Sequence, residues 1–244
     1  MPEQATIELC WICGLLIADS AEHTIKKSDL KSQFGNVAQG APLYLNSSNF
    51  KNKRIQSIDS VYVKASNSIC TNCNNFKSQP FDLAWASLSE FLREHSHTVK
   101  IGVNLFGIKE FPLRTRIQRR NLHLYFVKLF GVYAKEGNIP LPMKEFGASL
   151  RNGKPHPNIY LKFGRSVKTK ISRYAARTDV ETLFDRNKKL VLASCFYTVG
   201  EISVLMMFCA AEYRAKGLKT SWNPKMSIDQ LRFYDFEDEA VATK

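Results

Sequence analysis

The sequences CWIC at residues 10–13 and CTNC at residues 70–73 are two Cys-x-x-Cys pairs, and they decide how the N-terminal part of this 244-residue chain folds. A two-residue spacer lets a tight turn direct both thiolates of a pair to one point, and four such thiolates form the tetrahedral ligand set of structural zinc. The 56 residues between the pairs are too many for a simple zinc ribbon, so we expect further structure there. The pattern therefore predicts a structural zinc site with the ligands Cys10, Cys13, Cys70 and Cys73.

A glutamate and a histidine, Glu22 and His23, lie between the two cysteine pairs, and Asn74 directly follows the second pair. Hydrolysis of a phosphodiester needs a base that activates water and a divalent cation that neutralises the developing charge. His23 can supply the base, and the side-chain oxygen atoms of Glu22 and Asn74 can hold the cation. Oxygen ligands suit Mg²⁺ or Mn²⁺, so this would be a second metal site, separate from the zinc. Asn74 has an alternative role as the cap of the helix that follows it.

The same residues resemble the zinc-containing HNH endonucleases of the His-Me finger class, over residues 8 to about 92. The resemblance implies a ββα-metal fold, in which His23 on the first strand is the general base and Glu22 and Asn74 bind the catalytic metal ion. It also implies a middle asparagine that braces the histidine loop, for which Asn67 is the candidate. The activity that it implies is endonuclease cleavage of DNA. The stretches that carry the resemblance are Cys10-x-x-Cys13-Gly14, Glu22-His23-x-Ile25 and Cys70-x-x-Cys73-Asn74-Asn75-x-Lys77.

The positive charge of the chain lies in its C-terminal part. Residues 1–97 contain nine Lys and Arg against nine Asp and Glu, so residues 98–244 carry the whole net charge of +13. Such an excess favours a nucleic acid partner, and we expect double-stranded DNA. A solvated basic surface without a ligand is the alternative. The residues that we expect to contact the DNA are Lys77, Arg116, Arg119 and Arg120.

The first 97 residues are expected to form the zinc-stabilised ββα-metal module. Residues 21–25 predict a short strand with Glu22 and His23 on opposite faces, and residues 60–64 alternate as a second strand. Between them, residues 31–60 are rich in Gly, Asn, Ser and Lys and predict a long loop. A helix is expected to restart at Pro80, with an apolar stripe of Phe81, Ala84, Trp85, Leu88, Phe91 and Leu92 facing the core.

Residues 98–244 are expected to form a second, mixed α/β domain, which makes the whole chain an α+β protein with a boundary at residues 97/98. The sequence predicts a helix over 113–134 and strands over 158–163, 190–197 and 202–208, the last two joined near Gly200 as a hairpin. Cys195 and Cys209 lie in apolar contexts and are expected to be core thiols. His123, on an apolar helix, is expected in the core, and His156, between two prolines, on the surface.

The chain contains no run of 18 apolar residues, and its first residues are neither basic nor apolar. We therefore expect a cytoplasmic protein without a membrane partner. A single active site cuts both strands of DNA only by dimerising or by sequential nicks, so a homodimer or a partner protein is a further expectation.

Two other functions fit the same sequence. The first is a zinc-dependent nucleic-acid-binding or regulatory protein in which the finger is catalytically silent. The second is an interaction protein that uses its basic half to bind an acidic protein. Metal-dependent DNA cleavage that is lost in His23→Ala would separate the nuclease from the first alternative. Strongly salt-dependent binding to random duplex DNA would count against the second.

Overall fold

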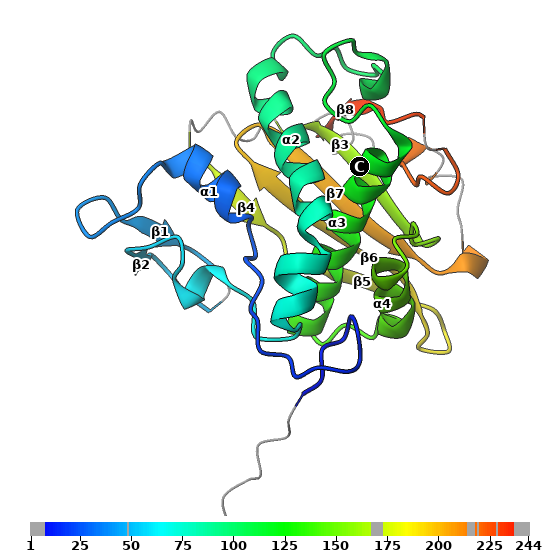
Figure 1. The fold of residues 1–244 in the computed structure, drawn as a ribbon, viewed down its shortest axis with the longest axis horizontal. Helices are drawn as coiled ribbons and strands as arrows, with labels where there is room; N and C mark the ends of the chain where they lie inside the picture. Colours follow the sequence, from blue (N-terminus) through cyan, green and yellow to red (C-terminus); the bar gives the residue numbers. More distant parts are fainter. Residues whose placement is uncertain are drawn as a thin grey trace, which may run out of the picture.

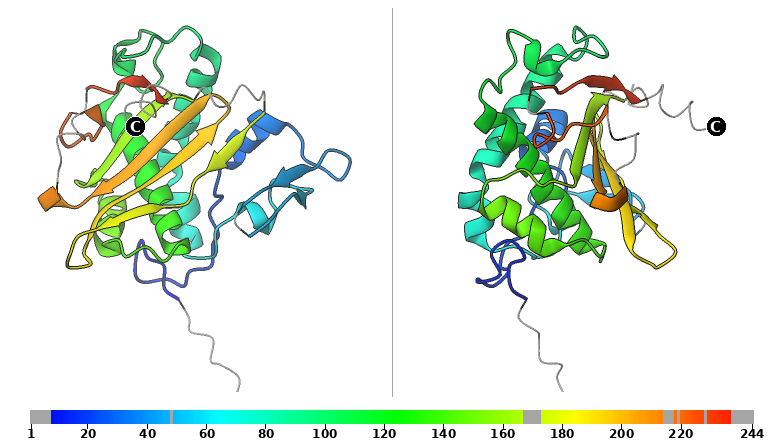
Figure 2. Two further views of the ribbon diagram at one scale, coloured as in Figure 1. Left: turned by 180° about the vertical axis from the view of Figure 1, so that it is seen from behind. Right: turned by 90° about the vertical axis from the view of Figure 1, so that its right-hand side faces the viewer.

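A computed structural model of the chain describes residues 8–47, 49–166, 173–213, 218, 220–227 and 229–236. Its larger part has two layers, a mainly antiparallel sheet with helices on one face (Figures 1 and 2). A smaller lobe, made from residues between the two cysteine pairs, lies beside these layers. The chain is therefore a mixed helix and sheet protein of the α+β type, as the sequence predicts.

The sheet is built from the C-terminal part of the chain. Its strands run in the order β4, β6, β7, β3 and β8, and β5 also pairs with β6. All pairs are antiparallel except β3 with β8. The predicted hairpin is confirmed: β6 and β7 pair from Leu192↔Cys209 to Val199↔Ile202, and Gly200 makes the turn at a φ of +57°. The strands are β3 Ile159–Arg165, β4 Ala175–Arg177, β5 Glu181–Phe184, β6 Leu190–Val199, β7 Ile202–Cys209 and β8 Phe233–Asp235.

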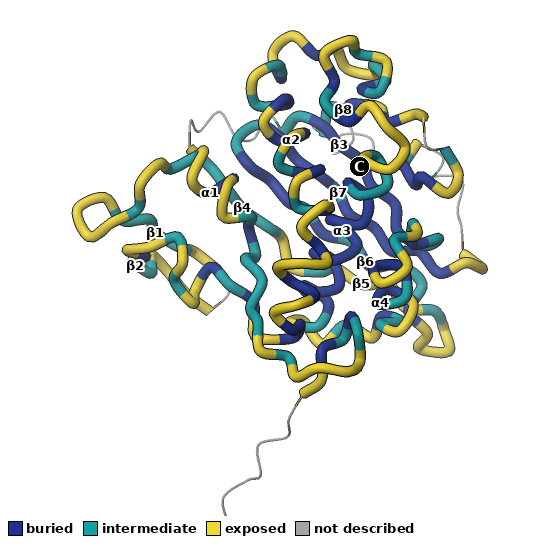
Figure 3. Tube along the Cα trace, in the orientation of Figure 1, coloured by how far each residue is buried: buried dark blue, intermediate teal, exposed yellow. Residues whose placement is uncertain are grey.

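Helix α3, Arg116–Glu136, is the central helix, and it follows the predicted span closely. It begins with a capping box, in which the Thr115 hydroxyl accepts from the Gln118 amide and the Gln118 side chain accepts from the Thr115 amide. Every residue from 122 to 134 is buried, because α2, α4 and the sheet surround the helix (Figure 3). The neighbouring helices are α2 Gln79–His95, whose predicted apolar stripe is buried, and α4 Met143–Arg151.

The region between the cysteine pairs differs from its prediction. Instead of one long loop, residues 31–60 contain the end of α1, Lys27–Phe34, and a two-stranded hairpin of β1, Leu43–Leu45, with β2, Lys53–Ile55. The strand expected at 60–64 is a 3₁₀ turn over Val61–Val63. The strand expected at 21–25 does not form in the described residues, where the isolated bridges Ser20↔Ile69 and His23↔Lys64 join the two flanks of the lobe instead. The apolar residues of this region do not alternate with polar ones over a long enough stretch to form long strands. Short turns and bridges therefore make the backbone hydrogen bonds here.

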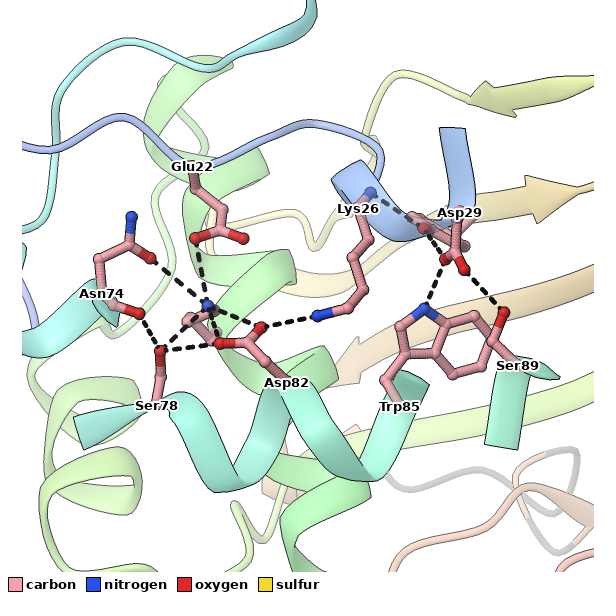
Figure 4. A network of polar contacts seen from close by, with 10 residues as sticks. Glu22, Lys26, Asp29, Asn74, Ser78, Asp82, Trp85 and Ser89 are labelled. Carbon is pink, nitrogen blue, oxygen red and sulfur yellow. Dashed lines mark hydrogen bonds and ion pairs between the residues drawn. The ribbon is translucent and has the colours of Figure 1, made fainter. Parts of the chain in front are cut away.

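A buried carboxylate, Asp29, ties α1 to the rest of the molecule. Its oxygen atoms accept from Trp85 Nε1 at 2.7 Å, Tyr197 Oη at 2.6 Å and Ser89 Oγ at 2.8 Å (Figure 4). The donors lie on α2 and β6, and Arg93 adds an ion pair. The expected domain boundary at 97/98 falls after α2, which shares one continuous hydrophobic core with α3 and the sheet. That boundary remains a prediction from sequence.

In the described part of the chain, none of the helices combines the length and the apolar character that a membrane crossing requires.

Candidate metal centre and the buried Lys128 network

The four predicted cysteine ligands meet at one point. Their sulfur atoms all lie within 4.8 Å of one another, and Cys13 Sγ is 3.9 Å from Cys70 Sγ. The first turn closes where the Gly14 amide donates to the Cys10 carbonyl at 2.7 Å, with Gly14 at a φ of +67°. In the second turn the Cys73 amide donates to Cys70 Sγ at 3.4 Å. The four thiols could therefore hold a metal ion such as zinc.

The thiols do not favour the same charge state on their own. Burial opposes ionisation of Cys13, but the amides of Leu16 and Leu15 and the neighbouring thiols lower its pKa to about 6. Burial raises the pKa of Cys10 and, more strongly, that of Cys73. Four thiolates so close together need a cation between them, because each one disfavours the charge of the next. A divalent metal ion supplies that positive charge. Four thiolate ligands around one divalent ion are the ligand set of a structural zinc site.

Two glycines form the seat of the first cysteine turn. A Cβ atom added at Gly131 of α3 would lie 2.6 Å from the Trp11 ring, and one at Gly147 of α4 would lie 2.8 Å from the Ile12 carbonyl oxygen. The Arg151 guanidinium also donates to that carbonyl. The turn that carries Cys10 and Cys13 thus packs closely against two helices that lie more than a hundred residues later in the sequence.

Next to the cysteines lies a second centre, built around the ammonium group of Lys128. This side chain is 1% exposed and projects from the middle of α3. Its Nζ lies 3.1 Å from Glu22 Oε2, 3.2 Å from both oxygen atoms of Asp82, 3.1 Å from Ser78 Oγ and 3.5 Å from Asn74 Oδ1 (Figure 4). The structure therefore brings together Glu22 and Asn74, two of the predicted metal ligands, around a cation of the protein itself.

The charges of this centre balance. Lys26 Nζ lies 3.5 Å from Asp82 Oδ1, so two ammonium groups face the two carboxylates of Glu22 and Asp82. Burial disfavours the charged form of Lys128, but Glu22 and Asp82 outweigh it and raise the pKa of Lys128. The Lys128 side chain is therefore protonated at neutral pH. A buried ion pair is stable only when both groups are charged and several hydrogen bonds satisfy them, and both conditions hold here.

Asn74 has a fixed orientation. It lies in a π-helical turn, η2 Asn72–Lys77, that leads into α2, and its side-chain nitrogen donates to Ser20 Oγ at 2.9 Å. Ser78 and Asp82 follow at intervals of four residues, the spacing that places side chains on one helical face. That spacing was the signal in the sequence that could have added Ser78 and Asp82 to the candidate site. Nothing in the local pattern singled out Lys128, which lies among apolar residues of a buried helix.

His23 points away from this centre. Its Nε2 lies 3.0 Å from the Ile58 carbonyl oxygen and 3.7 Å from Asp59 Oδ1, whereas the side chain of its neighbour Glu22 contacts Lys128. Opposite orientations follow from the extended backbone at residues 22 and 23. Burial lowers the pKa of His23, so the ring is neutral at pH 7. The other predicted site residue, Asn67, is exposed between Lys64 and Ile69.

The predicted DNA-contacting residues fall in two places. Lys77 is exposed near the cysteines, whereas the arginines lie at the N-terminal end of α3. Arg116 and Arg119 both contact Asp229, at 3.5 and 2.6 Å, and the Arg119 guanidinium lies 4.3 Å from the centroid of the Phe106 ring. Arg120 is half-buried. Of the three arginines, Arg116 is the most exposed, with 75% of its side chain accessible.

Comparison of this chain with family models, with curated proteins and with solved structures finds no match.

Proposed function

We propose that this chain is a zinc-stabilised nucleic-acid-binding protein whose HNH-like finger is catalytically silent. The observation that carries the proposal is the position of Lys128. Its ammonium group contacts Glu22 and Asn74, the two residues that would have to hold a catalytic metal ion.

A metal-dependent nuclease needs a divalent cation that both the scissile phosphate and an activated water can reach. Here the Glu22 side chain is 12% exposed, and Asn74 is buried. A divalent ion would have to displace a buried ammonium group that two carboxylates stabilise. His23 adds to the argument, because its Nε2 lies against the Ile58 carbonyl rather than beside Glu22.

Nucleic acid as the partner is supported by charge. The net charge is +13, and the excess of cations lies in residues 98–244. Lysine and arginine neutralise phosphates and release counterions, so binding of this kind weakens steeply with salt. An acidic protein partner would not give the slope expected for a polyphosphate chain.

The proposal is tested by two measurements on zinc-loaded protein. Fluorescence anisotropy with labelled DNA over a series of salt concentrations should give binding whose logarithm falls linearly with log[salt]. Conversion of supercoiled plasmid to nicked and linear forms, with Mg²⁺ or Mn²⁺, should give no product for the wild type. Cutting by the wild type that disappears in His23→Ala would contradict a silent finger. Absence of DNA binding would contradict the nucleic-acid function.

A metal-dependent HNH endonuclease is the second candidate, and one observation favours it. The segment that carries Glu22 and His23 pairs through single bridges with the segment before the second cysteine pair, and the next helical turn carries Asn74. This is the order of a ββα-metal finger. In that function Lys128 would withdraw, Mg²⁺ or Mn²⁺ would bind Glu22 and Asn74, and His23 would activate water. Cleavage of both strands of duplex DNA would then call for a homodimer or a partner.

A further inference from the structure

A large cavity lies between the lobe and the sheet layer, away from the cysteines. Its volume is about 1020 Å³, near the upper end of the roughly 300–1,000 Å³ typical of small-molecule sites. The hairpin β1–β2 and the turn over 61–63 form one wall, and the C-terminal end of α3 with residues 173–180 forms the other. Two neighbours of His23 also line the cavity: Thr24, the next residue in the chain, and Lys64, which forms the β-bridge with His23.

Aromatic side chains face solvent on the first wall. Phe50 is 38% exposed and Tyr62 is 41% exposed, and their rings pack edge to face with centroids 5.3 Å apart. Lys53 Nζ lies 4.5 Å from the centroid of the Tyr62 ring. Tyr174 lines the opposite wall. Exposed aromatic rings that cluster at a cavity mark a binding site more often than isolated ones do.

The acidic residues of the lobe, such as Glu22, Asp29 and Asp59, lie outside residues 30–58. Residues 30–58 contain four cations, Lys31, Lys51, Lys53 and Arg54, and no Asp or Glu. On the opposite wall Arg173 is exposed, and Arg177 is paired with Glu136. Asp179 is the other acidic residue of the lining. Cations interleaved with exposed aromatic rings suit a ligand that has both phosphates and flat apolar groups.

We propose that this cavity binds single-stranded DNA, with unstacked bases on Phe50, Tyr62 and Tyr174 and phosphates at Arg173 and at Lys53, which does not line the cavity but contacts the Tyr62 ring. In a duplex the base faces are covered by stacking, so only a single strand can use the aromatic rings. This inference rests on the proposed nucleic-acid function and adds to it a site for one kind of strand.

The test is anisotropy with a fluorescein-labelled single-stranded oligothymidylate and with a labelled duplex, for zinc-loaded full-length protein. The double variant Phe50→Ala/Tyr62→Ala should bind the single strand about tenfold or more weakly, with unchanged duplex affinity. Tyr62→Phe keeps the ring and should bind like the wild type. Phe76→Ala removes another exposed aromatic residue, one outside the cavity, and is the matched control that should also bind normally.

A second variant, Lys53→Ala/Arg173→Ala, tests the phosphate contacts without removing a ring. Its salt slope for the single strand should fall by about 1.4, because each phosphate contact contributes about 0.7. Unchanged single-strand affinity in both double variants would overturn the inference, and so would an equal loss in Phe76→Ala. Preference for RNA over DNA of the same sequence would overturn the assignment to DNA.

Different outcomes would contradict the single-strand site and the nucleic-acid function. If the wild type binds neither the single strand nor the duplex, the nucleic-acid function itself fails. If the wild type binds both and the cavity variants bind both equally well, only the cavity is wrongly assigned. Zinc content and thermal unfolding of each variant establish that the fold is intact.

Discussion

The lobe that carries the cysteines and the layer formed by the sheet and α3 are held together in different ways. In α3, every residue from 122 to 134 is buried, and the apolar surface of the sheet covers it. Between the cysteine pairs, buried apolar residues are few and scattered. The lobe is held instead by polar contacts, which are those of Asp29 and of the carboxylates around Lys128, and the four clustered cysteines beside it could hold a metal ion. A segment that has too few apolar residues to form its own hydrophobic core depends on such polar or metal-mediated contacts for its stability.

The largest effect should come from removing the metal ligands of the lobe. In Cys73→Ser we expect loss of bound zinc and a fall in the free energy of unfolding on the order of 5 kcal/mol or more. Metal analysis and thermal unfolding measure the two quantities. Cys195→Ala, at a buried thiol of the sheet, is the control and should keep its zinc. Amide hydrogen exchange in Cys73→Ser should increase first in residues 8–75. An equal increase across the whole molecule would show that the lobe and the sheet layer are not held together in different ways.

The next largest effect should come from the cation that joins the lobe to α3. Lys128→Met leaves Glu22 without its counter-charge and Asp82 with Lys26 alone, which should cost about 3–5 kcal/mol. Thermal unfolding with and without Mn²⁺ measures it. If Lys128 stands in place of a divalent ion, Mn²⁺ should raise the Tm of the variant and not that of the wild type. Lys135→Met, which removes an exposed pair with Glu8, should cost about 0–1 kcal/mol.

Acid should act on two buried histidines beside the sheet, His123 and His156, as well as on His23 of the lobe. Burial lowers the pKa of His123 to about 4 and that of His156 to about 3, from 6.5 in the unfolded chain. Between these values the unfolded chain binds more protons, so stability is full above pH 6.5 and falls as the pH drops. For His123 the loss between pH 7 and 5 is on the order of 2 kcal/mol. Urea unfolding at pH 7 and pH 5 should show a smaller loss of stability in His123→Gln than in the wild type. An equal loss in the two proteins would exclude His123 as the source of the acid sensitivity.

The smallest effect should come from the exposed end of α3. Arg116→Ala removes a surface contact with Asp229 and should change the free energy of unfolding by about 0–1 kcal/mol. If Arg116 contacts DNA, its salt slope on duplex should fall by about 0.9. Arg186→Ala, at another exposed arginine, is the control for the salt slope. An unchanged slope in Arg116→Ala would remove this arginine from the interface.

The sequence predicted well where one residue pattern sufficed. The apolar period of 113–134 gave α3, and the alternation on either side of Gly200 gave the β6–β7 hairpin. The two Cys-x-x-Cys pairs predicted the cluster of four thiols, because each pair is a local turn. Cys195 and Cys209 are buried, as expected.

The sequence predicted poorly where distant segments decide the structure. His156, expected on the surface, is buried, because its ring packs against Phe146 of α4 with centroids 4.4 Å apart. The hairpin β1–β2 and α1 have weak local periods and rest on other parts of the fold. The role of Lys128 depends on side chains 46 to 106 residues away in sequence, so no local pattern contained it.

The glycine seat of the first cysteine turn has a consequence for how the protein is made. Gly131 and Gly147, against which the turn of Cys10 and Cys13 packs, are synthesised more than a hundred residues after that turn. Cys70 and Cys73, the other half of the thiol cluster, follow the first pair after 56 residues. The first pair is therefore synthesised well before its partners, and its turn reaches its final packing only after α4 has been translated.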